Sequence, residues 1–320
     1  VGTMGVILMV LAKSGNVDVN IVAGAIIAGA FLGDRCSPMS SSANLVAALT
    51  KTSLYLNLEN MLKTSVLPFI LTCAGYGFFS LGHPLIGGNN PILAAIPQSF
   101  DLNPIVLLPA VLILAMAAVK IDVKISMFLS SLVGMAIALF VQKVELLTLL
   151  EYVATGYQLG QQGPLSEVIK GGGLLSMLQV SLIVLISSAY SGLFAGTGLL
   201  RDIELAYELI SRKTGIYIST LITSFVTSAF ACNQTLAVML THQLAQETYE
   251  KKQVNRYRLA LDLENTVIII SPLIPWNIAG AVPAAALSAD SGFIPYALYL
   301  FFVPLTYFFT RKATIKEEET

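Results

Sequence analysis

Residues 26–46 read IIAGAFLGDRCSPMSSSANLV, a stretch of charge, proline and serine set between two apolar runs. The apolar segment around it, residues 19–49, is too long for one straight helix across a bilayer, which needs about 20 residues. Pro38 removes a backbone donor and clashes with the preceding turn, so a helix must break close to it. The stretch therefore predicts a helix interrupted at 33–38 rather than a loop in solvent.

The composition places that broken helix in a membrane. Of 320 residues, 55% are hydrophobic and 12% are charged, and the mean hydropathy is +0.76. Soluble domains carry roughly twice that charged fraction. The 18 basic and 19 acidic residues leave no basic excess, which argues against nucleic acid as a partner. We expect an all-α polytopic membrane protein whose main partner is the lipid bilayer.

The apolar runs and the basic residues between them indicate the topology. Plain spans are expected at about 65–86, 104–119, 125–142, 174–199 and 293–310. If 215–246 is a hairpin that enters and leaves on one face, fourteen Lys and Arg residues fall on one side, against Lys13, Lys143 and Lys170 on the other. Basic residues concentrate on the cytoplasmic side, so we expect a multi-pass protein of the cell membrane with a cytoplasmic C-terminus.

A second interruption resembles the first. Ser271-Pro272-Leu273 followed by Asn277 matches Ser37-Pro38-Met39 followed by Asn44, and each comes after a polar or small-residue tip, at Asn233 and at Thr3. Four crossings separate the two broken helices, which makes them antiparallel. We therefore expect inverted-topology repeats, each with a re-entrant hairpin and a broken transmembrane helix, as is typical of secondary transporters with a site near the midplane.

This scheme gives an expected division of the chain. Residues 1–86 form the first repeat, 87–173 the connecting helices and an external linker, 174–310 the second repeat, and 311–320 a cytoplasmic tail. Because the chain opens in mid-pattern, we expect an N-terminal portion to precede it.

The two breaks also predict a site. Unwound backbone in a membrane costs several kcal/mol per unsatisfied group unless it lines a wet cavity or meets a ligand. Asp34 and Arg35 are the charges that lie deep within an apolar stretch, and Asp34 is suited to a cation or a proton. The expected ion-binding residues are Asp34, Ser37, Ser40, Ser41, Asn44, Asn233, Gln234 and Asn277. Sodium is expected at Asp34, Ser37 and Asn44, and no cofactor is expected beyond Na⁺ and H⁺ as transported ions.

Several residues allow more than one interpretation. Arg35 could form an ion pair with Asp34 that steadies the unwound turn, or could face an anion. The serine run could cap the half-helix that follows it, ligate an ion, or do both. Trp276 is equally compatible with packing, an interfacial anchor and a substrate contact. Asp262 and Glu264 could relay protons, although solvated acids at a helix start are the commoner case.

With these residues in hand, the sequence resembles the NhaC family of sodium:proton antiporters. The matching stretches are residues 28–45, Asn233-Gln234-Thr235-Leu236-Ala237 and Leu273-Ile274-Pro275-Trp276-Asn277. The family usually has an acid where this chain has Ser41 and another where it has Asn233. The resemblance would thus leave Asp34 as the sole clear acid of the cation site, and it implies that several helices precede Val1.

The resemblance and the two breaks together favour Na⁺/H⁺ antiport by alternating access, with Asp34 carrying the exchangeable proton or ion. The alternative is an ion-coupled exchanger or symporter of a small organic anion or amino acid on the same scaffold, for which Arg35 could hold a carboxylate. No nucleophile with a base, HExxH motif or P-loop occurs, so an enzyme is not expected. Small-residue faces permit a homodimer.

Overall fold

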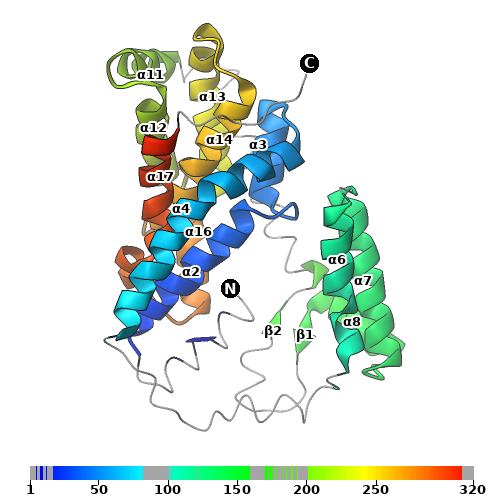
Figure 1. The fold of residues 1–320 in the computed structure, drawn as a ribbon. Coiled ribbons are helices and arrows are strands. Elements are labelled where there is room, and N and C mark those ends of the chain that lie inside the picture. The colour runs from blue at the N-terminus through cyan, green and yellow to red at the C-terminus, as the bar shows by residue number, and fades with distance from the viewer. Residues whose placement is uncertain are drawn as a thin grey trace. The chain divides into compact units, whose positions relative to one another are not determined.

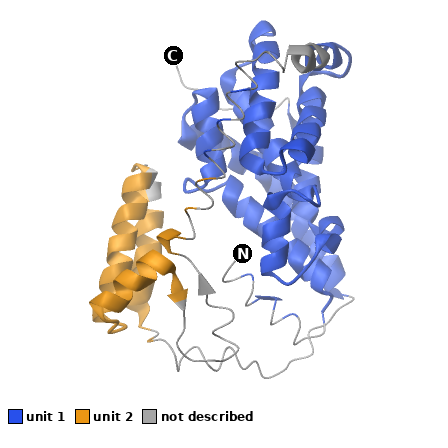
Figure 2. Cartoon of the chain, turned by 180° about the vertical axis from the view of Figure 1, so that it is seen from behind, with its two compact units in different colours: residues 1–86, 184–320 blue, residues 87–183 orange. Residues whose placement is uncertain are grey.

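The computed structural model describes residues 17–81, 101, 103–119, 121–158, 170–171, 173–175 and 201–311, with isolated residues at 5, 8, 9, 12, 178, 182, 185, 189 and 193. The expected first hairpin tip at Thr3, most of the expected span 174–199 and the tail after Arg311 lie outside the described residues. The chain divides into two units, residues 1–86 with 184–320, and residues 87–183 (Figure 2).

The first unit is helical throughout its described residues (Figure 1). Its N-terminal elements are α2 (Val19–Arg35), α3 (Ser41–Thr50) and α4 (Leu54–Leu81). Its C-terminal elements are α11 (Arg201–Thr214), α12 (Ile216–Ala231), α13 (Gln234–Lys251), α14 (Arg256–Asn265), α15 (Val267–Ile270), η2 (Ser271–Leu273), α16 (Ile278–Ala286), η3 (Ser291–Tyr296) and α17 (Leu298–Thr310). The described elements of both expected repeats therefore belong to this one unit.

The helices break at both predicted interruptions. α2 ends at Arg35 and α3 begins at Ser41, with the Ser40 hydroxyl accepting from the Ala43 amide as an N-cap. In the second interruption the helical run 256–273 and α16 are bent by 55°, and Asn277 caps α16. Gly280 makes the tight second bend feasible, because a Cβ there would lie 2.3 Å from the Pro272 carbonyl oxygen.

The segment predicted as a hairpin consists of two helices that pack along one another, α12 and α13. The chain reverses at Cys232, whose φ of 55° is left-handed, an uncommon conformation for a residue with a side chain. The Ile278 amide donates to the Cys232 carbonyl oxygen at 2.9 Å, which fixes the tip to the start of α16. Backbone strain of this kind persists only where surrounding contacts hold it.

Among the described residues of this unit, two apolar clusters are larger than the others. One joins α2 to α16, η3 and α17 through residues such as Ile27, Phe31 and Phe293. The other joins α3 to α13 and α14 through residues such as Val46 and Leu263. α4 instead exposes a run of large apolar side chains, and it is the described helix that is by itself long and apolar enough to cross a membrane. The bent 256–286 run would make a second such span if it counts as one.

The second unit contains η1 (Pro104–Leu107), α6 (Leu108–Ala118), α7 (Val123–Phe140), α8 (Leu146–Thr155) and a two-stranded antiparallel sheet of β1 (Tyr157–Gln158) and β2 (Lys170–Gly171). α6 and α7 pack together, and the Ser130 hydroxyl donates to the Pro109 carbonyl oxygen at 3.0 Å. Their bounds agree with the expected spans 104–119 and 125–142. The segment expected to be a linker contains the short apolar helix α8.

Candidate functional site

Asp34 lies in the last turn of α2 and is held by the serines that open α3. Its two carboxylate oxygens accept from Ser40 Oγ at 2.9 Å and from Ser42 Oγ at 2.6 Å. Because Ser40 also caps α3, capping and carboxylate binding are combined in one side chain. The half-buried carboxylate therefore stands at the helix break, bonded to neutral hydroxyls rather than to a cation.

Arg35 turns away from Asp34, so the interpretation as a mutual ion pair is wrong. Its fully buried guanidinium donates from Nη1 to Ser65 Oγ and to Tyr299 OH, the latter at 3.2 Å. Nη2 donates to Thr64 Oγ1 at 2.9 Å and to Asn265 Oδ1. These acceptors are neutral and come from α4, α14 and α17. The guanidinium thus clamps three helices while its positive charge has no directly bonded counterion among them.

Glu264 supplies a second acid beside this guanidinium. Its side chain is 1% exposed, and neither carboxylate oxygen has a hydrogen-bond partner among the described residues. Arg35 and Asp34 are the charged groups that act on it electrostatically. Arg35 Nε and Asn265 Nδ2 are likewise buried without partners in the described part of the chain. Buried polar atoms without partners are rare, and each calls for a physical explanation such as a bound ion or a water.

The charges of this cluster do not balance. With both acids ionised, Asp34 and Glu264 carry two negative charges against the single positive charge of Arg35. An uncompensated charge away from water costs several kcal/mol, so a group of this kind either takes up a proton or pairs with a cation. One proton or one monovalent cation neutralises the excess. The arrangement can therefore hold either of them in competition.

The other predicted site residues form a second polar group where the α12–α13 tip meets the second break. Asn277 is fully buried and donates to the Ser228 carbonyl oxygen at 2.8 Å, and Gln234 donates to the Ile268 carbonyl oxygen at 3.2 Å. Asn233 caps α13 by accepting from the Leu236 amide. Trp276 is 60% exposed and donates to the Ala229 carbonyl oxygen, so this hydrogen bond connects the second break to the end of α12 at the protein surface.

The predicted residues around the first break differ in what they do. Ser37 accepts from the Met39 amide at 3.1 Å, and Asn44 donates to the carbonyl oxygens of Pro38 and Ser40, so both brace the unwound turn. Ser41 is exposed and makes no described contact with Asp34. The serine that does hold Asp34 from inside α3 is Ser42, which the sequence interpretation had left outside the site.

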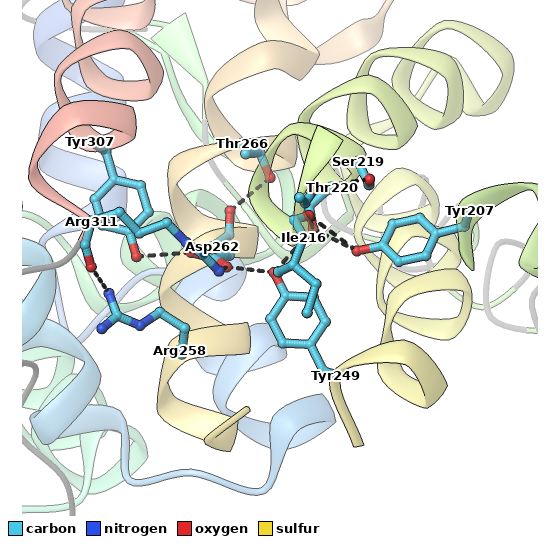
Figure 3. A network of polar contacts seen from close by, with 11 residues as sticks. Tyr207, Ile216, Ser219, Thr220, Tyr249, Arg258, Asp262, Thr266, Tyr307 and Arg311 are labelled. Atoms are coloured by element: carbon cyan, nitrogen blue, oxygen red, sulfur yellow. Dashed lines mark hydrogen bonds and ion pairs between the residues drawn. The ribbon is translucent and has the colours of Figure 1, made fainter. Parts of the chain in front are cut away.

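Asp262, two residues before Glu264, has a different environment (Figure 3). It is fully buried and accepts from Tyr249 OH at 2.5 Å, from Tyr307 OH at 2.8 Å and from Arg311 Nη2 at 2.5 Å. Tyr249 OH lies 3.0 Å from Thr220 Oγ1, which in turn lies 2.8 Å from Tyr207 OH. The Asp262 network, defined by these six residues, ties α14 to α11, α12, α13 and the end of α17.

The expectation that Asp262 and Glu264 are solvated acids at a helix start is wrong. α14 begins at Arg256, so both acids lie in its second half, and both are buried. The apolar pattern predicts the second broken segment at 264–289, whereas the helix begins at Arg256, because the charged first turn of α14 interrupts the apolar run. The signal that could have found Glu264 is its spacing, since it lies 13 residues before Asn277, within the length of one span.

A model of the Na⁺/H⁺ antiporter family matches residues 29–310. The chain is 24% identical over 310 residues to an uncharacterized Na⁺/H⁺ antiporter of Haemophilus influenzae, covering 93% of the chain and 66% of that protein. It is 25% identical over 315 residues to the malate-2H⁺/Na⁺-lactate antiporter of Bacillus subtilis, covering 95% of the chain and 66% of that protein.

A third relative is the Na⁺/H⁺ antiporter NhaC of Alkalihalophilus pseudofirmus, which is 28% identical over 319 residues, covering 95% of the chain and 67% of that protein. The chain thus spans about two thirds of the length of these relatives. No solved structure matches it.

Proposed function

The chain belongs to the Na⁺/H⁺ antiporter family, and from this membership and its buried acids we propose that it exchanges Na⁺ for H⁺ by alternating access. It would do so as a multi-pass protein of the cell membrane with its C-terminus in the cytoplasm, in keeping with the distribution of basic residues. The observation that carries the proposal is Glu264, an acid 1% exposed without a hydrogen-bond partner among the described residues, within electrostatic reach of Asp34 and Arg35.

In this proposal Asp34 and Glu264 share one exchangeable positive charge. When a proton occupies the cluster, one acid is neutral and the net charge is zero. When Na⁺ enters, the serine hydroxyls at Asp34 and the carboxylate oxygens supply hard oxygen ligands, and the proton leaves because both cations cannot be held against the charge of Arg35. Arg35 keeps its place through neutral acceptors, which leaves the acids free to change partners.

We further propose that the two broken segments are inverted repeats whose breaks move relative to the scaffold during transport. Each break has a Ser-Pro pair followed by a capping residue, Ser40 before α3 and Asn277 before α16. The α12–α13 hairpin would be re-entrant. Hydrogen bonds from Asn277 and Trp276 to the end of α12 would connect its tip to the second break. Asn233, Gln234 and Asn277 would face the ion from this side in one of the two transport states.

The test is Na⁺-induced pH change in everted membrane vesicles that contain the full-length protein. We expect Na⁺ to dissipate an imposed pH gradient with the wild-type protein and to lose this effect in Asp34→Asn and in Glu264→Gln. The matched control is Glu247→Gln, which neutralises an acid that is exposed and forms an ion pair with Lys251. Exchange at the wild-type rate in both site variants would remove the acid pair from the mechanism.

A second candidate is exchange of small carboxylates, which the similarity to the malate-2H⁺/Na⁺-lactate antiporter of Bacillus subtilis favours. The environment of Arg35 weighs against it, because both terminal nitrogens of this guanidinium already donate to protein acceptors. Uptake of labelled malate or lactate into proteoliposomes decides between the two. Carboxylate transport that disappears in Arg35→Gln and persists in Glu264→Gln would favour this second candidate.

A further inference from the structure

A cavity of about 150 Å³ lies apart from the acid cluster, between the end of α3, one face of α13 and the start of α14. Lys51, which ends α3, and Arg256, the first residue of α14, line it together with His242, Gln246 and Glu250 of α13. On α13 these three side chains are spaced by four residues, which puts them on one helix face. The cavity therefore brings three elements and five polar side chains together.

His242 is the residue that calls for a ligand. Its side chain is 6% exposed and lines the cavity, and no hydrogen bond to it occurs among the described residues. An imidazole carries at least one N–H donor, and a buried polar side chain normally has a hydrogen-bond partner, from the protein or from a bound molecule. The ring is thus aimed into a space in which a polar partner would satisfy it.

The charges around the cavity indicate the sign of that partner. Lys51 and Arg256 supply two positive charges, and the start of α14 adds the positive end of a helix dipole. Glu250 is the one carboxylate in the lining, and one of its oxygens already accepts from Gln246 Nε2 at 2.8 Å. The lining therefore has a net positive charge and exposes N–H donors, a combination that suits an anion.

We propose that this cavity binds a small tetrahedral oxyanion, of the size and charge of a phosphate group. The inference rests on the lining of the cavity and does not depend on the proposed antiport. Its effect would reach the rest of the protein through Tyr249, whose ring lines the cavity while its hydroxyl holds Asp262. Occupancy would therefore stiffen the Asp262 network, which joins α11, α12, α13, α14 and α17.

The experiment measures binding of radiolabelled inorganic phosphate to the purified full-length protein in detergent. We expect saturable binding to one site per chain, competed by sulfate. The double variant Lys51→Gln with Arg256→Gln should weaken it at least tenfold, and His242→Leu should weaken it measurably. Lys63→Gln is the control, because Lys63 is an exposed lysine of α4 that pairs with Glu59 and does not line the cavity.

The phosphate group could come from solution or from a lipid headgroup, and nanodiscs separate these sources. Phosphate binding that persists in nanodiscs containing phosphatidylglycerol supports a soluble ligand, whereas binding seen in phosphatidylcholine nanodiscs and lost with phosphatidylglycerol supports an anionic headgroup. Circular dichroism checks that each variant is folded, and a folded conservative variant, Lys51→Arg with Arg256→Lys, should keep the binding. Absence of saturable binding in every medium, or equal affinity in the wild type and the double variant, overturns the proposal.

Discussion

Asp262 and Glu264 lie two residues apart on α14, and both are buried, yet their surroundings differ. Asp262 accepts hydrogen bonds from two tyrosines and an arginine, whereas Glu264 has no hydrogen-bond partner among the described residues. Residues two apart on a helix point to different sides, so one helix delivers the two acids to two environments. In the proposed function, the paired acid stabilises one arrangement of helices and the unpaired acid exchanges a proton for Na⁺.

This difference explains why burial alone does not identify a functional acid. A buried ion pair often contributes little net stability, but removing one partner is costly because the other charge remains. Burying an acid costs desolvation free energy, and an acid without hydrogen-bond partners makes no contact that offsets this cost. Its presence therefore indicates a ligand or a proton. The predictions below test whether the two acids divide structure and transport in this way.

The largest effect is expected for Glu264→Gln. The amide keeps the shape of the side chain and removes the charge, so exchange should fall by a factor of at least 100 while the free energy of unfolding stays the same or rises. Exchange is measured in proteoliposomes and unfolding by denaturant titration in micelles. A Gln variant that transports normally would show that exchange does not need the charge of Glu264, and one that fails to fold would show that this charge serves the fold.

Asp262→Asn should show the opposite pattern. It leaves Arg311, which is about one quarter exposed, without its counterion and weakens the hydrogen bonds from two tyrosines. We expect a loss of about 3 kcal/mol in the free energy of unfolding. The exchange rate per folded molecule should remain within a few-fold of the wild type, and a complete loss of exchange in a stably folded variant would place Asp262 in the transport path.

Substituting lysine for Arg35 and for Arg311 compares the arginine near Glu264 with the arginine that pairs with Asp262. Arg35 donates to five acceptors on three helices, and a lysine has only three N–H donors, so at least two acceptors lose their donor in Arg35→Lys, at a cost of about 2 kcal/mol. Arg311→Lys keeps a positive charge close to one carboxylate and should cost less. Equal losses in the two variants, measured by the same denaturant titration, would contradict the assigned difference in geometry.

Removing single tyrosine hydroxyls should have smaller effects. Tyr307 donates to the charged Asp262 at 2.8 Å, whereas Tyr76 OH donates to a neutral group, the Tyr296 carbonyl oxygen, at 2.7 Å. Hydrogen bonds to charged groups contribute about 1.5–3 kcal/mol and neutral ones about 1 kcal/mol. Tyr307→Phe should therefore lower the free energy of unfolding more than Tyr76→Phe does, and the reverse order would show that the hydrogen bond to Asp262 is not the stronger of the two.

A partly exposed surface acid, Glu208, gives the smallest effect and sets the baseline. Hydrogen bonds from Arg212 and Lys251 hold the pKa of Glu208 below its ordinary value of 4.5. A lowered pKa stabilises the fold above pH 4.5, and this contribution is lost as the pH falls through the lowered value. Glu208→Gln should therefore unfold at nearly the wild-type temperature at pH 7 and at the same temperature at pH 3. A clear destabilisation at pH 7 would contradict the view that exposed pairs contribute little.

Much of the fold was predictable because the membrane imposes a simple rule on the sequence. Long apolar runs must be helices, and proline with serine inside such a run must break one, so the interruptions at Pro38 and Pro272 followed from chain chemistry. The start of α14 could not be predicted in this way, because its first turn carries Arg256 and Arg258. Charged residues end an apolar run whether or not the helix continues.

The sequence indicated the part of the site around Asp34, but it did not indicate the direction of Arg35 or the place of Glu264 beside it. Asp34 and Ser40 followed from a charge and a cap at a helix break, and both lie together. The sequence left open whether Arg35 pairs with Asp34 or faces an anion, because the direction in which a side chain leaves a helix end depends on contacts with α4, α14 and α17 that are distant in sequence. The spacing of Glu264 from Asn277 indicates that both lie in one span, but the approach of Glu264 to Asp34 and Arg35 depends on the same tertiary packing.

The central claim is that Asp34 and Glu264 share one site at which Na⁺ displaces a proton. It is tested most directly by proton release from the purified protein in weakly buffered micelles, read with a pH-sensitive dye as Na⁺ is added. We predict saturable release from the wild type and from folded Asp262→Asn, and none from Glu264→Gln or Asp34→Asn. Release from Glu264→Gln and Asp34→Asn equal to that of the wild type would contradict the claim.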